Sequence, residues 1–290
     1  MKPRAPWHPW AMLGPTLALL GVFWVLPVLR AAVYSLYAWD LLTPPRFVGL
    51  ANYRALARSG VAWRALVTTV EYSALVVVGS MALGLALALA LQGRGRLVGF
   101  VRASIFSAYV VSWVAVALLW TWLLDPDAGA VAAMLRALHL PRVGFLGDPS
   151  TALPTLAAVT VWKLTGYAMI LFTAGLQDVP ASLLEAAALD GAGPVARFRY
   201  VTWPMLGPTA AFVATTSLIV SFQAFDIVRI MTQGGPVHAT TLFVYAIYEQ
   251  VFLDLRVGRA SALTVVFFVA LVGLAALQLR AWRARGGERA

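Results

Sequence analysis

Six long apolar stretches constrain this chain more than any other feature. They cover about 11–37, 65–91, 100–124, 152–177, 207–232 and 259–282. Crossing the ~30 Å hydrocarbon core of a bilayer takes about 20 apolar residues in a helix. The chain is 61% hydrophobic and 12% charged, whereas a soluble domain has roughly 25% charged residues. The sequence therefore predicts an all-α polytopic membrane protein with six transmembrane helices.

Composition also excludes several classes of site. The chain has no cysteine, so it can form neither a disulfide framework nor a thiolate metal site. Its three histidines, His8, His139 and His238, fall in separate segments, and no metal site is expected. The net charge of +10 comes from short arginine clusters between apolar stretches, where arginines orient a membrane protein, so nucleic acid is not an expected partner. The first apolar stretch exceeds the ~7–15 residues of a signal peptide and is expected to be retained.

The orientation follows from the loops. Six spans place both termini on one side, together with the connectors 92–99 and 178–206, whereas 38–64, 125–151 and 233–258 lie on the other. The first side carries eleven Lys and Arg and the second eight, with the higher density in the short connectors of the first side. Because positive loops stay in the cytoplasm, both termini are predicted to be cytoplasmic, in a bacterial plasma (inner) membrane.

The longest cytoplasmic connector contains a patterned stretch, "EAAALDGAGPVARFRYVTWPML", from Glu185 to Leu206. A short helix is expected before Gly191, with Ser182 and Glu185 spaced as in a capping box. Pro194 suits the first turn of a second short helix. Small side chains in this segment permit close approach by another protein. On physical grounds alone, the loop could equally cap its own helical bundle.

This stretch resembles the EAA loop in the membrane subunits of bacterial binding-protein-dependent ABC importers. The matching residues are Glu185, Ala186, Ala187, Asp190, Gly191, Ala192, Phe198 and Pro204. The stretches 47–56, 162–180, 225–236 and 244–252 also resemble the sugar-importing branch of that family, whose members import maltose and related sugars. Ser107 and Ala108 depart from the Leu-Pro that is usual in the third span of that family.

The resemblance implies a type I importer fold and a division of labour. The two short helices would dock into a groove on a separate ATPase subunit and transmit its movements to the spans. The chain lacks a phosphate-binding loop of the G-x-x-x-x-G-K-[ST] type, so any ATP and Mg²⁺ would be used by partner subunits and no cofactor is expected here. The expected parts are a first span with an external loop (1–63), the transmembrane core (64–282) and a cytoplasmic tail (283–290).

The implied assembly contains a second homologous permease, two ATPase subunits and an extracytoplasmic binding protein that delivers a carbohydrate. The alternative substrate is glycerol-3-phosphate or a related phosphorylated polyol, because that subgroup shares the same motifs. A proton-coupled secondary transporter would need a carboxylate near the midplane of the membrane. Glu71 and Asp226 are expected nearer the outer interface, too far from the midplane for that role. A membrane-embedded transferase would need clustered catalytic side chains, which the sequence lacks, so the chain is not expected to be an enzyme.

Ionisable residues within or beside the spans are costly and normally face a cavity or a partner. Arg30, Glu71, Asp226 and Arg229 are placed near the outer interface, where snorkelling or a local ion pair could explain them. Lys163 is deeper and is expected either to pair with Asp226 or Glu71, or to line a vestibule. The residues expected along a substrate path are Lys163, Tyr167, Gln223, Asp226, Arg229 and Glu71.

Overall fold

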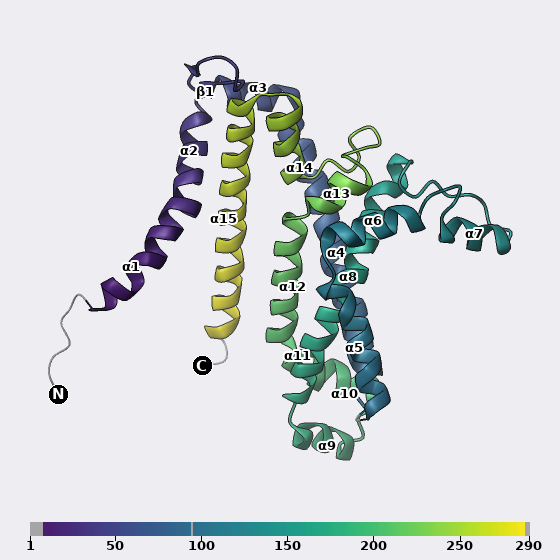
Figure 1. The fold of residues 1–290 in the computed structure, drawn as a ribbon. Coiled ribbons are helices and arrows are strands. Elements are labelled where there is room, and N and C mark those ends of the chain that lie inside the picture. Colours follow the sequence, from purple (N-terminus) through teal and green to yellow (C-terminus); the bar gives the residue numbers. More distant parts are fainter. Residues whose placement is uncertain (1–7, 94, 288–290) are drawn as a thin grey trace. The chain divides into compact units, whose positions relative to one another are not determined.

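The computed structural model describes residues 8–93 and 95–287. The described chain is helical apart from one two-stranded hairpin and the connecting loops (Figure 1). In order, its elements are α1 (His8–Leu20), η1 (Gly21–Val25), α2 (Leu26–Tyr34), β1 (Tyr37–Ala38), β2 (Arg46–Phe47), α3 (Ala51–Ser59), α4 (Val61–Ala90), α5 (Arg96–Val110), α6 (Trp113–Leu123), α7 (Ala130–Ala137), α8 (Pro149–Gln177), α9 (Ala181–Leu189), α10 (Pro194–Arg197), η2 (Phe198–Thr202), α11 (Trp203–Met205), α12 (Gly207–Phe222), α13 (Asp226–Met231), α14 (Phe243–Tyr248), η3 (Glu249–Leu253) and α15 (Val257–Gly287).

The apolar helices match the expected spans in number. Within the described residues, four helices are long and apolar enough to cross a membrane, and there are six spans if each of two bent pairs is one span. The four are Met12–Tyr34, Val61–Ala90, Pro149–Gln177 and Val257–Ala276. The all-α polytopic fold is therefore confirmed, with two of its spans broken.

The third span is not the single helix expected over 100–124. Helix α5 ends at Val110, α6 begins at Trp113, and the two helices meet at 100°. Val111 and Ser112 are extended, with ψ of 142° at both residues, so they cannot continue the helix. The bend lies beyond Ser107 and Ala108 and forms without a proline.

The fifth span also differs from the single helix expected over 207–232. Its helix α12 ends at Phe222, and the short helix α13 starts only at Asp226. At its other end α12 meets the segment Pro194–Met205 at 66°. Helix α13 packs against α6, so the two segments that follow the breaks contact each other.

The chain divides into two compact units, one of Met1–Arg64 with Ala246–Ala290 and one of Ala65–Tyr245. In the first unit, α15 packs against α2 and α3, and β1 pairs with β2 in antiparallel fashion. Buried Asn52 links α3 to this hairpin, because its Nδ2 donates to the carbonyls of Ser35 at 2.8 Å and Tyr37 at 2.9 Å. This hydrogen bonding fixes the connection that follows α2.

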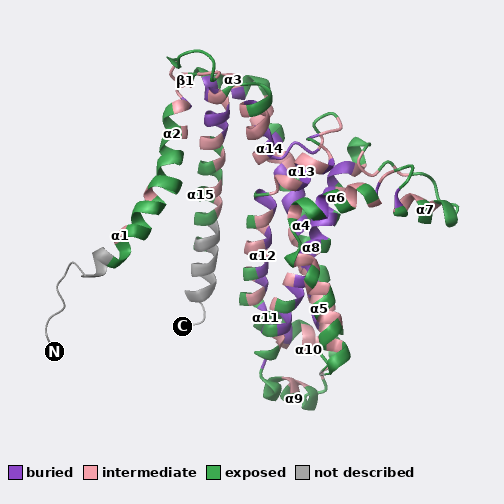
Figure 2. Ribbon diagram, in the orientation of Figure 1, coloured by how far each residue is buried: buried purple, intermediate pink, exposed green. Residues whose placement is uncertain are grey.

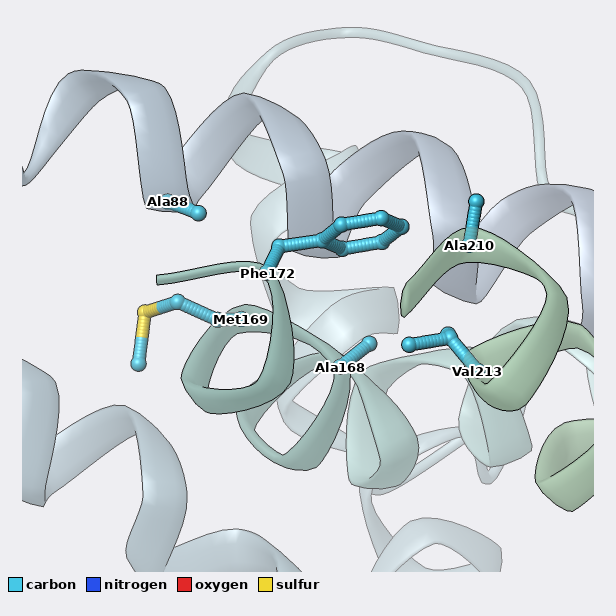
Figure 3. Close-up of a cluster of buried hydrophobic side chains, with 6 residues drawn as sticks. All are labelled: Ala88, Ala168, Met169, Phe172, Ala210 and Val213. Carbon is cyan, nitrogen blue, oxygen red and sulfur yellow. The ribbon is translucent and has the colours of Figure 1, made fainter. Parts of the chain in front are cut away.

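Helix α8 is the centre of the second unit. In the most apolar 18-residue stretch of α8, 67% of the residues are buried, against 28% in the corresponding stretch of α4. Figure 2 shows this contrast. One core cluster contains side chains from α4, α8 and α12: Ala88, Ala168, Met169, Phe172, Ala210 and Val213. Figure 3 shows Phe172 and Ala168 lying between α4 and the residues of α12.

Small residues allow the helices to approach closely at α8. A methyl group added at Gly166 would lie 2.5 Å from the carbonyl oxygen of Ile105, and one at Gly84 would lie 2.5 Å from Ala168 Cβ. Hydroxyl groups add bonds between helices, such as Tyr72 to Thr160 at 2.6 Å. Small residues and interhelical hydroxyl bonds are typical of helix packing in membranes, where the hydrophobic effect does not drive association.

Candidate functional site

The patterned loop forms two short helices joined by a glycine turn. Helix α9 ends in a Schellman motif. The backbone amide of Gly191 donates to the carbonyl of Ala188, and the amide of Ala192 donates to the carbonyl of Ala187. Gly191 has φ of +79°, a conformation that glycine adopts without strain. Pro194 occupies the first turn of α10, as expected. The alanines and glycine of the motif therefore set the angle between the two helices.

The start of α9 differs from the expected capping box. The helix begins at Ala181, directly after Pro180, and no side chain caps it. Ser182 consequently lies within the first turn and cannot act as the N-cap residue. Glu185 is then not needed for capping, and its side chain is exposed.

Most of α9 is exposed, in contrast to α8, which precedes it in the chain (Figure 2). Glu185, Ala186 and Asp190 are exposed, whereas Ala187 and Ala192 are half-buried. Large apolar side chains also project here: Leu189 is 90% exposed and Val195 is 80% exposed. Exposed apolar side chains grouped in this way indicate a contact surface. The sequence prediction missed Leu189 and Val195, although both stand within the patterned stretch.

Phe198 and Pro204 occupy the second half of the loop. Phe198 is half-buried and its ring lies 6.3 Å from that of Trp203, between ring centroids. Pro204 is exposed near the bend where α11 leads into α12. These residues lie between the exposed loop and the fifth span.

Lys163 lies where α5 and α6 separate. The side chain is only 2% exposed. Its Nζ donates to the carbonyls of Ala108 at 3.1 Å and Tyr109 at 2.9 Å, and also to that of Val111. The ammonium also lies 4.8 Å from the centre of the Trp113 ring. It therefore supplies hydrogen bonds to carbonyls at the end of α5, which have no partner within the helix.

The partner expected for Lys163 is not found. Within the described residues, no hydrogen bond or ion pair joins Lys163 to Glu71 or Asp226, because its ammonium binds the carbonyls. Glu71 and Gln223 are exposed, whereas Asp226 and Arg229 are half-buried on α13. Glu71 and Lys163 therefore form neither a hydrogen bond nor an ion pair with each other in the described part of the chain.

Tyr167, unlike Lys163, borders an open hollow. Its ring stacks on that of Tyr109 with centroids 4.8 Å apart and planes 16° apart. The two rings, Leu164 and residues of α12, among them Thr216, line a hollow of about 200 Å³. In the described part of the chain, neither phenol hydroxyl has a protein hydrogen-bond partner. Tyr109 was missed from the sequence, since its stacking depends on the bend after α5.

A second hollow, of about 480 Å³, lies beside the hairpin in the first unit and is lined by Arg46, Arg256 and Arg259. Asp40 also borders it, but its carboxylate accepts bonds from Thr43 N at 2.7 Å, Thr43 Oγ1 at 2.8 Å and Leu42 N. These bonds, those of Thr43 foremost, lower the pKa of Asp40. None of the three arginines forms an ion pair within the described residues, so the hollow is electropositive.

Known proteins are similar to this chain in sequence and in fold. Residues 80–286 match the family described as "Binding-protein-dependent transport system inner membrane component". The sn-glycerol-3-phosphate transport system permease protein UgpA of Agrobacterium fabrum is 33% identical over 278 residues, which are 94% of this chain and 93% of that protein. The corresponding UgpA of Escherichia coli O157:H7 is 31% identical over 96% of this chain and 94% of its own.

Among solved structures, a bacterial ABC transporter involved in the import of the acidic polysaccharide alginate superposes with a TM-score of 0.81 at 23% identity. The superposition covers 96% of this chain and 95% of that one, so the two folds agree throughout. The family match spans well over half of the chain and includes the complete loop from α9 to α11. This chain belongs to the family of inner membrane components of binding-protein-dependent transport systems.

Proposed function

We propose that the chain is one permease subunit of an ATP-driven importer with both termini in the cytoplasm. A second homologous permease would complete the path, two ATPase subunits would hydrolyse ATP, and an external binding protein would deliver the substrate. Family membership and the UgpA relatives support this assembly. So does the solved alginate transporter, which is described in complex with a pentasaccharide-bound periplasmic protein.

The observation that carries the proposal is the exposed helix α9. The nine-residue helix that follows the most buried span leaves Glu185, Leu189 and neighbouring Val195 exposed. This surface suits docking into a groove on an ATPase subunit, with Leu189 as an apolar anchor and Glu185 facing a basic residue. Gly191 would hold the angle between α9 and α10, and Phe198 with Pro204 would relay movement to α12.

For the substrate, the hollow beside Tyr109 and Tyr167 favours a carbohydrate. A sugar presents C–H groups that pack on an aromatic ring and hydroxyls that bond to phenol oxygens. None of the described residues that line this hollow is charged, and the ammonium of Lys163 is already bound to carbonyls. The path would therefore select for hydroxyl groups and ring shape at this level, with Gln223, Asp226, Arg229 and Glu71 as further candidates along it.

A phosphorylated polyol is the second candidate, and the arginine hollow favours it. Arg46, Arg256 and Arg259 offer three guanidinium groups, while the carboxylate of Asp40 is held by its own loop. Guanidinium groups bind phosphate through paired hydrogen bonds. The relatives named as sn-glycerol-3-phosphate permeases point to the same chemistry.

Uptake into proteoliposomes that contain the complete transporter tests these proposals. Uptake should require both ATP and the binding protein, and uptake driven by a proton gradient without ATP would contradict the assembly. Glu185→Lys should abolish coupling of ATP hydrolysis to uptake, because it sets like charges against each other. If Glu185→Lys transports normally, α9 is not the coupling element.

Two further substitutions separate the substrate classes. Tyr109→Ala should raise the KM for a neutral sugar about three- to tenfold through loss of ring stacking, whereas Tyr109→Phe should keep most of the affinity. Arg256→Gln should raise the KM for glycerol-3-phosphate and leave a neutral sugar unaffected. A Tyr109→Ala transporter with unchanged KM for its substrate would remove the aromatic hollow from the path.

A further inference from the structure

A third hollow, of about 490 Å³, lies within the second unit behind residues 181–205, called here the coupling loop after its proposed role. Helices α4, α5 and α8 contribute to its wall, and α9, α10 and η2 line it from the loop side. Arg102 of α5 and Arg197 of α10 both line it, whereas none of the described lining residues is Asp or Glu. The hollow therefore carries two positive charges with no carboxylate among its lining residues.

The two arginines have hydrogen-bond donors that the protein does not use. Arg102 donates through Nη2 to the carbonyl of Leu91, but its Nε is buried and finds no acceptor among the described residues. The Nε of Arg197 is likewise buried without an acceptor, and no hydrogen bond or ion pair involves the Arg197 side chain within the described residues. Guanidinium groups carry five N–H donors, and a buried donor without a partner is costly. Buried donors that the protein leaves unpaired could be satisfied by an anion that accepts from them.

The position of the hollow narrows the chemistry of that ligand. Helix α4 ends at Ala90, α5 starts at Arg96, and α8 ends at Gln177, so the hollow lies where three spans leave the hydrocarbon core. Lipid phosphates occupy this level of a bilayer, and basic pockets between spans bind anionic headgroups there. Leu89 and Leu176 supply apolar wall beside the two guanidinium groups.

We propose that this hollow binds a phosphate anion, supplied either by the headgroup of an acidic phospholipid or by a soluble phosphate. Small rotations of Arg102 and Arg197 would bring their Nε donors onto the phosphate oxygens. Gln92 and Gln177, which line the same hollow, offer amide donors. Because Arg197 directly precedes Phe198, the bound anion would also hold the coupling loop against α5.

Two arms of one experiment test the site and identify the source of the phosphate. In the first, the complete detergent-purified transporter is equilibrated with phosphatidylglycerol or phosphatidylcholine, and retained lipid is measured by native mass spectrometry. In the second, the delipidated complex is mixed with millimolar phosphate or chloride at equal ionic strength, and its thermal stability is measured. The variants are Arg102→Gln and Arg197→Gln, with Arg199→Gln as a control.

Arg199 is a suitable control because it is exposed, lies in the same loop and does not line the hollow. The wild type and Arg199→Gln should retain phosphatidylglycerol over phosphatidylcholine, and each of the other variants should lower this retention about tenfold. Stabilisation by phosphate that depends on Arg197 would instead identify a soluble source.

The proposal is overturned if neither the retention of phosphatidylglycerol nor the stabilisation by phosphate depends on Arg102 or Arg197. It is also overturned if Arg199→Gln loses as much of either effect as the Arg102→Gln and Arg197→Gln variants do. Should Arg102→Gln fail to assemble, because its bond to Leu91 is lost, Arg197→Gln decides alone. Neither arm measures transport, so the result does not depend on which substrate the transporter imports.

Discussion

Replacing Lys163 with methionine tests whether its ammonium stabilises the bend between α5 and α6. Methionine keeps the length of the side chain and removes the charge. Three carbonyls, of Ala108, Tyr109 and Val111, would lose their donor. Carbonyls near the end of a helix have no intrahelical partner, so they would depend on any water that enters the bend.

The size of the effect follows from these contacts. An unsatisfied buried carbonyl costs about 1–3 kcal/mol, and the exposed positions Val111 and Ser112 favour the lower end. Removing the ammonium also relieves the cost of burying a charge. We therefore expect Lys163→Met to lower the free energy of unfolding by about 2–4 kcal/mol. Glu71→Gln, at an exposed position, should change it by less than about 0.5 kcal/mol.

Equilibrium unfolding of the purified chain in mixed detergent and SDS micelles, followed by tryptophan fluorescence, measures these differences. The double variant Lys163→Met with Asp226→Asn should be no more stable than Lys163→Met alone, because the ammonium binds carbonyls. Restoration of stability by Asp226→Asn would show an ion pair and refute the reasoning. So would a Lys163→Met protein of wild-type stability whose transport of a phosphorylated substrate is lost.

Three other predictions follow from the loop, the orientation and the packing. A cysteine at Gly193 should be labelled only from the cytoplasm and one at His238 only from outside, and labelling of both from one side would contradict six spans. Gly191→Val, at φ +79°, should lower substrate-stimulated ATP hydrolysis through backbone strain. Gly193→Val, at φ −67°, is the matched control. Equal loss of ATP hydrolysis in the two variants would contradict the role of backbone strain. Gly166→Ala should lower stability by about 1–3 kcal/mol, because its methyl group meets the Ile105 carbonyl, whereas Gly99→Ala enters open space; equal melting temperatures would disprove close packing there.

Local turn chemistry made much of the coupling loop predictable. Gly191 and Pro194 have strong conformational preferences of their own, so the turn and the start of α10 could be placed from the sequence. The capping box failed because the helix starts two residues earlier than a Ser182 cap would require, directly after Pro180, which puts Ser182 inside the helix. The exposure of Leu189 and Val195 could not be predicted, since it depends on which face of the loop packs against the rest of the unit.

The sequence by itself determined that this is an all-α membrane protein of a recognisable family. Segment length and hydrophobicity report how each helix is solvated by lipid, and that property needs no knowledge of neighbouring segments. The tertiary structure alone decided where the spans break and what Lys163 does. A helix can end at Val110 only if its carbonyls find a donor, and that donor comes from a residue 52 positions beyond Val111. The stacking of Tyr109 on Tyr167 depends on the same contact between distant segments, which no local pattern encodes.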